Sequence, residues 1–226
     1  YFPRLLPRQL DTDCGNMLKE EITNMGIEVE LDAKTQKILA NDSGSVRGIL
    51  LERGEEYPAD IILVQAGVHP KIDLAKEAGL KTNKGIIIDD YLETSVKDIY
   101  AVGDCIEYKG EIWGIIPACM EQSKIAAVSI AGKEKKEYTG TTPQNTLKIV
   151  GIDLTSVGVY DPSEELGGGW EILKKADKKN NCYQKIVLKD NKLKGAILNG
   201  EKSKEAVPYV RKNIESEVEE KKLREL

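Results

Sequence analysis

Apolar residues near the N-terminus recur with a helical period. Over residues 12–25 they are spaced by four, four and three positions, which places them on one face of a helix. These positions are Cys14, Leu18, Ile22 and Met25. Asp11 can cap the start of this helix with its side chain, and Gly26 can end it in the left-handed conformation.

Short apolar runs then replace the helical pattern. Strands are expected over residues 27–31, 38–40 and 46–52. The Asn-Asp-Ser-Gly sequence at 41–44 is typical of a tight turn between the last two of them. The pattern therefore predicts an antiparallel meander.

Three later runs are apolar without interruption. Residues 59–67, 85–89 and 98–103 each contain consecutive apolar side chains, which is typical of strands buried on both faces in a parallel sheet. Helices are predicted over residues 72–78 and 117–131, and each is followed directly by a glycine that can end it.

The rest of the chain has a different character. A polar hinge at 133–137 (Lys-Glu-Lys-Lys-Glu) precedes five strand-length runs and a final helix from about Ala206. The strands are expected at 146–150, 155–160, 169–174, 182–188 and 193–198. Asp190 and Asn191 are predicted to form a hairpin turn between the last two. The fold class is therefore α/β, followed by a small α+β C-terminal domain.

Composition narrows the classes of function. The 226 residues include 33 Lys and Arg against 38 Asp and Glu, a net charge of −5, so we expect no nucleic-acid partner. No apolar run approaches the roughly 20 residues of a membrane-spanning helix, so we expect no membrane contact. The four cysteines are scattered and His69 is the single histidine, so we expect no metal site and a reducing, cytoplasmic location.

One segment has the pattern of a binding site. Residues 94–104 (Thr-Ser-Val-Lys-Asp-Ile-Tyr-Ala-Val-Gly-Asp) are expected to contain the buried strand at 98–103, which ends at Gly103 and is followed by Asp104. Ligands of α/β folds bind at the carboxyl ends of strands. Gly103 would let a ligand approach the backbone, and Asp104 would accept hydrogen bonds from hydroxyl groups. The helix start at 117–119 would present N–H groups and a partial positive charge.

This segment resembles the second FAD fingerprint of the pyridine nucleotide–disulfide oxidoreductase superfamily, T-x5-h-A-h-G-D. Residues 6–11, 59–68 and 118–127 are similar to further motifs of that family. Residues 146–158 resemble the C-terminal domain of its branch of NADH:rubredoxin oxidoreductases and nitrite reductase flavin subunits. The resemblance implies an incomplete FAD/NAD(P)-binding Rossmann-like portion ahead of the C-terminal domain.

The resemblance also implies a role for each site residue. Asp104 would bind the ribityl chain of FAD, next to Gly103. The helix start, Pro117, Ala118 and Cys119, would face the flavin N1/O2 edge with its N–H groups. Gly67 would line the nicotinamide nucleotide site. A hydride would pass from NAD(P)H to the flavin, and electrons would go on to a redox acceptor such as rubredoxin or an attached reductase.

Both G-x-G-x-x-G phosphate loops of the family are absent from the chain. We therefore expect a C-terminal portion of a longer oxidoreductase. The expected domains are 1–70 from the NAD(P)-binding domain, 71–137 from the FAD-binding domain, and 138–226 as the C-terminal domain. We further expect a homo-oligomer or a partner segment to cover the buried strand at 98–103.

Simpler interpretations remain open at this stage. Asp104 can be an ordinary turn residue, and Cys105 and Cys119 can be small buried side chains. His69-Pro70-Lys71 stands where the family often has Arg-Pro-Asn. The alternative function is a non-catalytic module for dimerisation or acceptor docking that binds no flavin by itself. A nucleotide-binding regulator is a third hypothesis.

Overall fold

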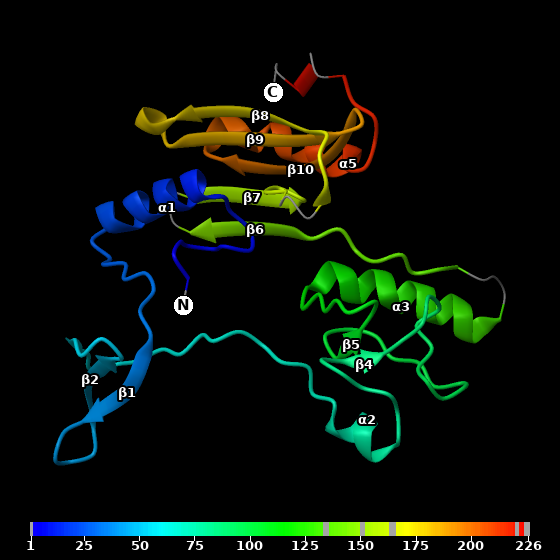
Figure 1. The fold of residues 1–226 in the computed structure, drawn as a ribbon, viewed down its shortest axis with the longest axis horizontal. Helices are drawn as coiled ribbons and strands as arrows, with labels where there is room; N and C mark the ends of the chain where they lie inside the picture. The colour runs from blue at the N-terminus through cyan, green and yellow to red at the C-terminus, as the bar shows by residue number, and fades with distance from the viewer. Residues whose placement is uncertain (1, 133–135, 150–151, 163–165, 220–221, 224–226) are drawn as a thin grey trace. The chain divides into compact units, whose positions relative to one another are not determined.

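The structure is a computed structural model and describes residues 2–132, 136–149, 152–162, 166–219 and 222–223. The chain divides into two compact units (Figure 1). One contains the described residues up to Leu63 and those from Gln144 onward, and the other is Val64–Pro143. Residues 133–135 of the expected hinge and residue 150 of an expected strand lie outside the described residues.

The first helix forms as its apolar spacing predicts. Helix α1 spans Thr12–Asn24, and the side chain of Asp11 accepts a hydrogen bond from the backbone N–H of Cys14 at 3.0 Å. Gly26 follows with a φ of 84°, a conformation that glycine adopts without steric cost. Both predicted ends of this helix are confirmed to within a residue.

The meander that follows is a three-stranded antiparallel sheet. It comprises β1 (Thr35–Ala40), β2 (Val46–Leu51) and β3 (Glu56–Pro58), in the order β1-β2-β3. The expected strand at 27–31 is wrong: these residues are irregular and have no ladder partner among the described residues. Glu56–Pro58 completes the meander instead, because its backbone pairs with β2.

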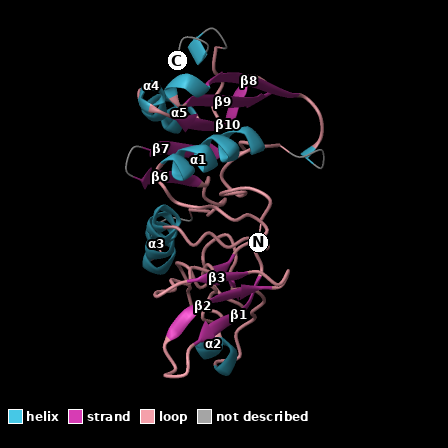
Figure 2. Cartoon of the chain, turned by 90° about the vertical axis from the view of Figure 1, so that its left-hand side faces the viewer, coloured by secondary structure: helices cyan, strands magenta, loops and turns pink. Residues whose placement is uncertain are grey.

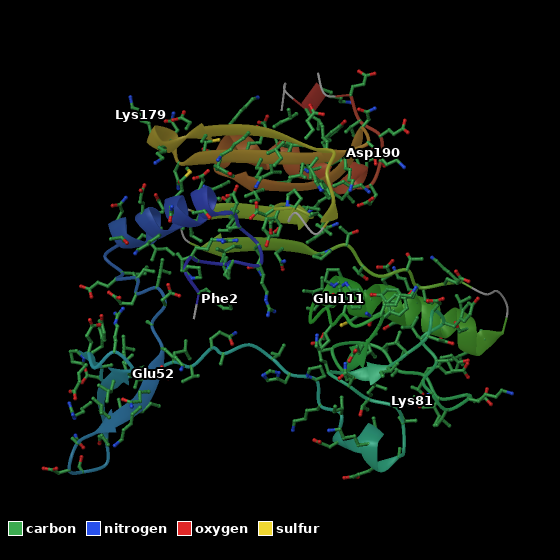
Figure 3. The ribbon with its side chains drawn as sticks, viewed as in Figure 1. Phe2, Glu52, Lys81, Glu111, Lys179 and Asp190 are labelled. Carbon is green, nitrogen blue, oxygen red and sulfur yellow. The ribbon has the colours of Figure 1, made fainter. Side chains whose placement is uncertain are left out.

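The C-terminal residues form a five-stranded antiparallel sheet in the order β6-β7-β10-β9-β8. Its strands are β6 (Gln144–Ile149), β7 (Ile152–Gly158), β8 (Trp170–Asp177), β9 (Cys182–Lys189) and β10 (Lys192–Asn199). The five predicted strands are thus confirmed. Asp190 and Asn191 have φ values of 52° and 58° in the predicted turn between β9 and β10, and Figure 3 shows Asp190 there. A short 3-10 helix, Lys178–Asn180, joins β8 to β9.

Both faces of this sheet are covered by helices (Figures 1 and 2). Side chains alternate along a strand, so neighbouring residues of β9 enter different cores. Ile186 packs in the core formed with helix α5 (Ala206–Asn213), which follows the short helix α4 (Glu201–Lys204). Tyr183 packs in the core formed with α1. Pro208 lies in the first turn of α5, where its missing N–H is tolerated.

The second unit has little regular structure before its long helix. It contains α2 (Asp73–Glu77), β4 (Ile86–Ile87), β5 (Ile106–Glu107) and α3 (Ile116–Ala131). The strand expected at 85–89 is present only as β4, whose parallel partner β5 lies outside the predicted strands, with Ile86 opposite Ile106. Helix α3 ends at Gly132, whose φ of 62° is left-handed, as predicted.

Two of the predicted buried strands are wrong. Residues 59–67 form no strand, and Ile61 and Leu63 are 87% and 92% exposed. A buried strand needs neighbours that satisfy its backbone and cover its side chains. Among the described residues of this run, only the Ala59 N–H bonds to a neighbouring strand, at the Arg47 carbonyl, and the apolar side chains that follow lie exposed. Residues 98–103 also form no parallel strand, because Tyr100 bridges to Glu93 in an antiparallel manner.

Candidate functional site

The Gly103–Asp104 turn lies ahead of strand β5 rather than at the end of a strand. The backbone reaches it from the antiparallel bridge at Tyr100, and the N–H of Ile106 bonds to the Gly103 carbonyl at 3.4 Å. Gly103 has a φ of 92°, which a side chain would strain. The turn therefore depends on glycine at this position, although the expected strand before it is absent.

Asp104 lies beside the first turn of α3. The thiol of Cys119 donates a hydrogen bond to Asp104 Oδ1, with 3.3 Å between sulfur and oxygen. The carboxylate is exposed, and no side chain caps the helix start at Ile115. A negative charge near a helix N-terminus interacts favourably with the helix dipole.

The amide groups of this helix start are partly engaged. The N–H groups of Ala118 and Cys119 both donate to the carbonyl of Ile115, at 3.1 and 3.3 Å. Pro117 has no N–H to offer. The expected free N–H groups at Ala118 and Cys119 are therefore paired, because the first turn closes on Ile115.

Two apolar side chains of the α3 start are exposed. Ile116 and Met120 lie one helical turn apart on α3, which also carries Cys119, and are 78% and 58% exposed. An exposed carboxylate and exposed apolar side chains at one helix start suit a ligand that has both hydroxyl groups and a flat apolar ring.

Burial and the neighbouring carboxylate keep the site cysteines protonated. Burial raises the pKa of the Cys119 thiol, and the hydrogen bond to Asp104 raises it further. Burial also raises the pKa of Cys105. Cys119 therefore acts as an S–H donor at neutral pH rather than as a reactive thiolate.

Gln122 holds the turn from inside α3, and sequence reasoning missed this role. Its side-chain oxygen accepts a hydrogen bond from the Gly103 N–H at 2.8 Å, and its side chain is buried. The residue stands in the motif at 118–127, but only its distance from Gly103 in space shows what it does.

Gly67 makes no direct contact with the Asp104 turn in the described structure. It has a φ of 86°, and a side-chain carbon placed on it would meet no atom within 4 Å. The next residue, Val68, approaches Gly114 in the loop that leads to α3. Of the six expected site residues, the structure gathers Gly103, Asp104 and the helix start, 117–119.

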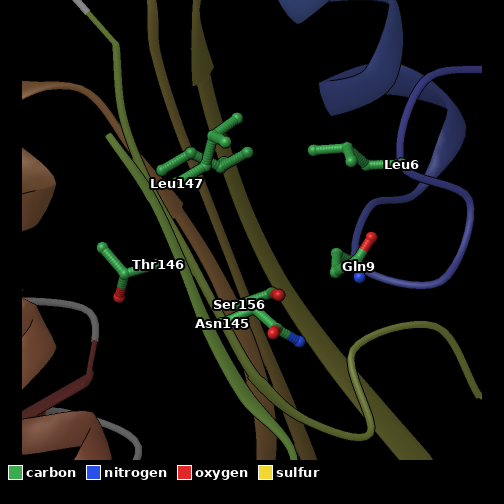
Figure 4. A pocket seen from close by; sticks show the side chains of 7 residues that line it. Leu6, Gln9, Asn145, Thr146, Leu147 and Ser156 are labelled. Atoms are coloured by element: carbon green, nitrogen blue, oxygen red, sulfur yellow. The ribbon is translucent and has the colours of Figure 1, made fainter. Parts of the chain in front are cut away.

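A cavity of about 170 Å³ lies elsewhere, in the first unit. Figure 4 shows Leu6 and Gln9 of the N-terminal segment facing Asn145, Leu147 and Ser156 on β6 and β7. Among the described residues no three His, Cys, Asp or Glu side chains gather in a way that could hold a metal ion. None of the helices in the described ranges is long and apolar enough to cross a bilayer.

Comparison with known proteins decides the family. Residues 1–134 match the family model described as pyridine nucleotide-disulphide oxidoreductase, and residues 143–218 match the rubredoxin NAD+ reductase C-terminal domain. The chain belongs to the pyridine nucleotide-disulphide oxidoreductase family. The resemblance found in the sequence and the fold class expected from it are thereby confirmed.

Relatives within this family resemble the chain over most of its length. It is 35% identical over 201 residues to a nitrite reductase [NAD(P)H] of Bacillus subtilis, covering 89% of this chain and 24% of that protein. It is 30% identical over 201 residues to the NADH-rubredoxin oxidoreductase of Clostridium acetobutylicum, covering 88% of this chain and 46% of that protein. The chain thus spans less than half the length of these two relatives.

A solved structure agrees with these relatives. The crystal structure of NADH:rubredoxin oxidoreductase from Clostridium acetobutylicum superimposes with a TM-score of 0.62 at 27% identity. The match covers 93% of this chain and 49% of that one. The family's oxidoreductase fold is therefore shared, as a partial Rossmann-like region followed by a C-terminal domain.

Proposed function

We propose that the chain is the C-terminal portion of an FAD-dependent NAD(P)H oxidoreductase that passes electrons to a small redox acceptor. The single observation that carries the proposal is the position of Asp104, exposed and hydrogen-bonded to Cys119 at the start of α3. The NADH-rubredoxin oxidoreductase similarity supports an acceptor such as rubredoxin, and the nitrite reductase similarity supports an attached reductase.

The residues at this turn fit the part of FAD that they would hold. The Asp104 carboxylate would accept hydrogen bonds from ribityl hydroxyl groups, and the exposed apolar strip of Ile116 and Met120 would lie against the ring. When bound, FAD supplies a ring that accepts a hydride from NAD(P)H and releases electrons singly or in pairs.

The chain's own groups would orient the ligand and place charge beside it. The positive end of the α3 dipole, at Pro117, Ala118 and Cys119, would stabilise negative charge near it. The Cys119 S–H holds the Asp104 side chain at the helix start. Gly67 would line the nicotinamide nucleotide site. The domain division 1–70, 71–137 and 138–226, with a homo-oligomer, belongs to the same proposal.

Titration of the chain with FAD tests this proposal. Flavin fluorescence is followed for the unmodified chain, for Asp104→Asn and for Asp98→Asn. Asp98 is an exposed residue nearby with a φ of 65°, a conformation that asparagine tolerates, so it is a matched control. Asp104→Asn is expected to weaken binding by roughly tenfold, the effect of losing a charged acceptor, and Asp98→Asn is expected to leave binding unchanged.

The alternative is a non-catalytic module for docking or dimerisation. It is favoured by the five-stranded sheet, which has a core on each face and takes no residue from the Asp104 turn. Such a module would fold and associate without flavin. An unmodified chain whose FAD titration shows no fluorescence change, and which forms dimers on size-exclusion chromatography, would replace the first proposal with this one.

A further inference from the structure

Gln122 and Tyr138 form a buried pair between α3 and the segment that follows it. The Gln122 side chain is 1% exposed and Tyr138 is 0% exposed. Gln122 Nε2 donates to the Tyr138 hydroxyl at 3.0 Å, while Gln122 Oε1 accepts from the Gly103 N–H at 2.8 Å. A single amide thus joins the Gly103–Asp104 turn to residues beyond the end of α3.

The direction of these hydrogen bonds is set by the groups at the two ends. The Gly103 N–H can only donate, so it bonds to the oxygen of the Gln122 amide, which leaves the amide nitrogen to donate to Tyr138. At the far end Thr141 donates its single hydroxyl proton to the Glu121 carboxylate at 2.7 Å. The bond between Tyr138 and Thr141, 2.9 Å long, must therefore use the Tyr138 proton.

The result is a one-way chain of donors. It runs from Gln122 through Tyr138 and Thr141 to Glu121, and the first and last of these are neighbours on α3. Its first hydrogen bond, from Gln122 to Tyr138, is buried, where hydrogen bonds aligned head to tail strengthen one another, whereas the last, from Thr141 to Glu121, is exposed. Further contacts hold the same segment, since Trp113 Nε1 donates to the Thr141 carbonyl at 2.7 Å.

We propose that Gln122 is a positioning residue for the Gly103–Asp104 turn, and that Tyr138 and Thr141 hold its amide in the orientation this requires. The inference rests on the proposed FAD-binding role of the turn. Because Tyr138 and Thr141 lie in the segment between the two family models, which end at 134 and begin at 143, that segment helps to shape the flavin-facing turn. A change in it would alter flavin affinity without touching a flavin-contacting residue.

Hydrogen exchange at the Gly103 amide tests the positioning without any flavin. Tyr138→Phe keeps the buried ring and removes the acceptor of Gln122, so exchange at Gly103 is expected to quicken about fivefold. Tyr91→Phe is the matched control, because it also removes a tyrosine hydroxyl that contacts this segment. The Tyr91 hydroxyl donates a hydrogen bond to Glu137, the residue before Tyr138, at 2.9 Å on the surface. Unchanged exchange in Tyr138→Phe, measured by NMR, would overturn the inference.

Gln122→Glu gives a second test that a purely steric role would not pass. When the introduced carboxyl group is ionised, it accepts hydrogen bonds from the Gly103 N–H and from the Tyr138 hydroxyl. The Tyr138 proton is then no longer available for the hydrogen bond to Thr141. When it is protonated, it can again donate to Tyr138. The nearby groups that bear charge or titrate are Glu121, Tyr138, Tyr108, Asp104 and Cys119. Because an ionised carboxylate is a stronger acceptor than an amide, Gly103 exchange in Gln122→Glu is expected to be slower than in the unmodified chain at pH 7. The difference should shrink towards pH 5, after correction for intrinsic exchange, and exchange equal to that of the unmodified chain at both pH values would contradict the inference.

FAD titration of the same variants separates the two proposals. Weaker binding by Tyr138→Phe, by about threefold to tenfold, together with unchanged binding by Tyr91→Phe, supports the positioning role. Equal affinity of Tyr138→Phe and the unmodified chain would refute it while the flavin site stands. If the unmodified chain binds no FAD, the proposed function of this chain fails, and the exchange at Gly103 alone decides whether Gln122 positions the turn.

Discussion

The ammonium group of Lys185 lies 3.0 Å from Asp11 Oδ2, at the contact between strand β9 and the start of helix α1. The Lys185 side chain is only 6% exposed, and Asp161 lies 2.9 Å away on its other side. The Tyr183 hydroxyl donates to the same Asp11 oxygen. One carboxylate thus caps α1 and binds two side chains of the sheet, which ties the helix to the C-terminal domain.

Removing this carboxylate is expected to destabilise the first unit. Asp11→Asn can still cap the helix, but it leaves Lys185 buried with only Asp161 as a partner, at an expected cost of about 3 kcal/mol. Urea unfolding in a Trp113→Phe background, in which Trp170 reports on the sheet, measures the loss. Asp42→Asn, in the exposed β1–β2 turn, should leave the midpoint unchanged.

The stability of the first unit is also expected to depend on acid. Burial alone would raise the pKa of Asp11, but hydrogen bonds from Tyr183, from the Cys14 N–H and from Lys185 outweigh it and lower the pKa below its ordinary 3.8. The charged form therefore stabilises the fold above that value, and the stabilisation is lost as pH falls through the lowered pKa. Unfolding curves between pH 5 and pH 2 should converge for the unmodified chain and Asp11→Asn; parallel curves would contradict this.

Gly195 on β10 is expected to tolerate no side chain. A carbon placed on it would lie 2.3 Å from the carbonyl oxygen of Val159, a backbone atom that cannot move aside without distorting the sheet. Gly195→Ala should lower the free energy of unfolding by at least about 1–3 kcal/mol. Gly168→Ala meets no atom within 4 Å and serves as the control, with an expected change near zero. Thermal or urea unfolding measures both.

The reactivity of Cys119 is expected to report on Asp104. Burial and the Asp104 carboxylate both raise the pKa of this thiol, so Asp104→Asn removes one of the two causes and increases the thiolate fraction at pH 8. Alkylation by iodoacetamide, followed by mass spectrometry of the Cys119 peptide, should therefore be faster in Asp104→Asn. Asp98→Asn should alkylate at the unmodified rate. Slower or equal alkylation in Asp104→Asn would show that the carboxylate does not act on the thiol.

Local patterns predicted those elements whose determinants lie close together in the chain. The cap at Asp11, the glycine after α3 and the hairpin turn at Asp190 and Asn191 each depend on a few neighbouring residues. The five strands of the C-terminal sheet were also predictable, because their alternation needs no knowledge of the partner strand. The ordered motifs indicated the family for the same reason, and they placed Asp104 near the start of α3.

Contacts between distant residues were decided only by the tertiary structure. No local signal pairs Gln122 with Tyr138, or buries Lys185 between two carboxylates, since both depend on which elements pack together. The apolar run at 59–67 has the composition of a buried strand, but among the described residues it pairs with no strand beyond the contact of Ala59, and Ile61 and Leu63 are exposed. A sequence sets what each segment can bury and bond, whereas the packed chain determines which of those possibilities find a partner.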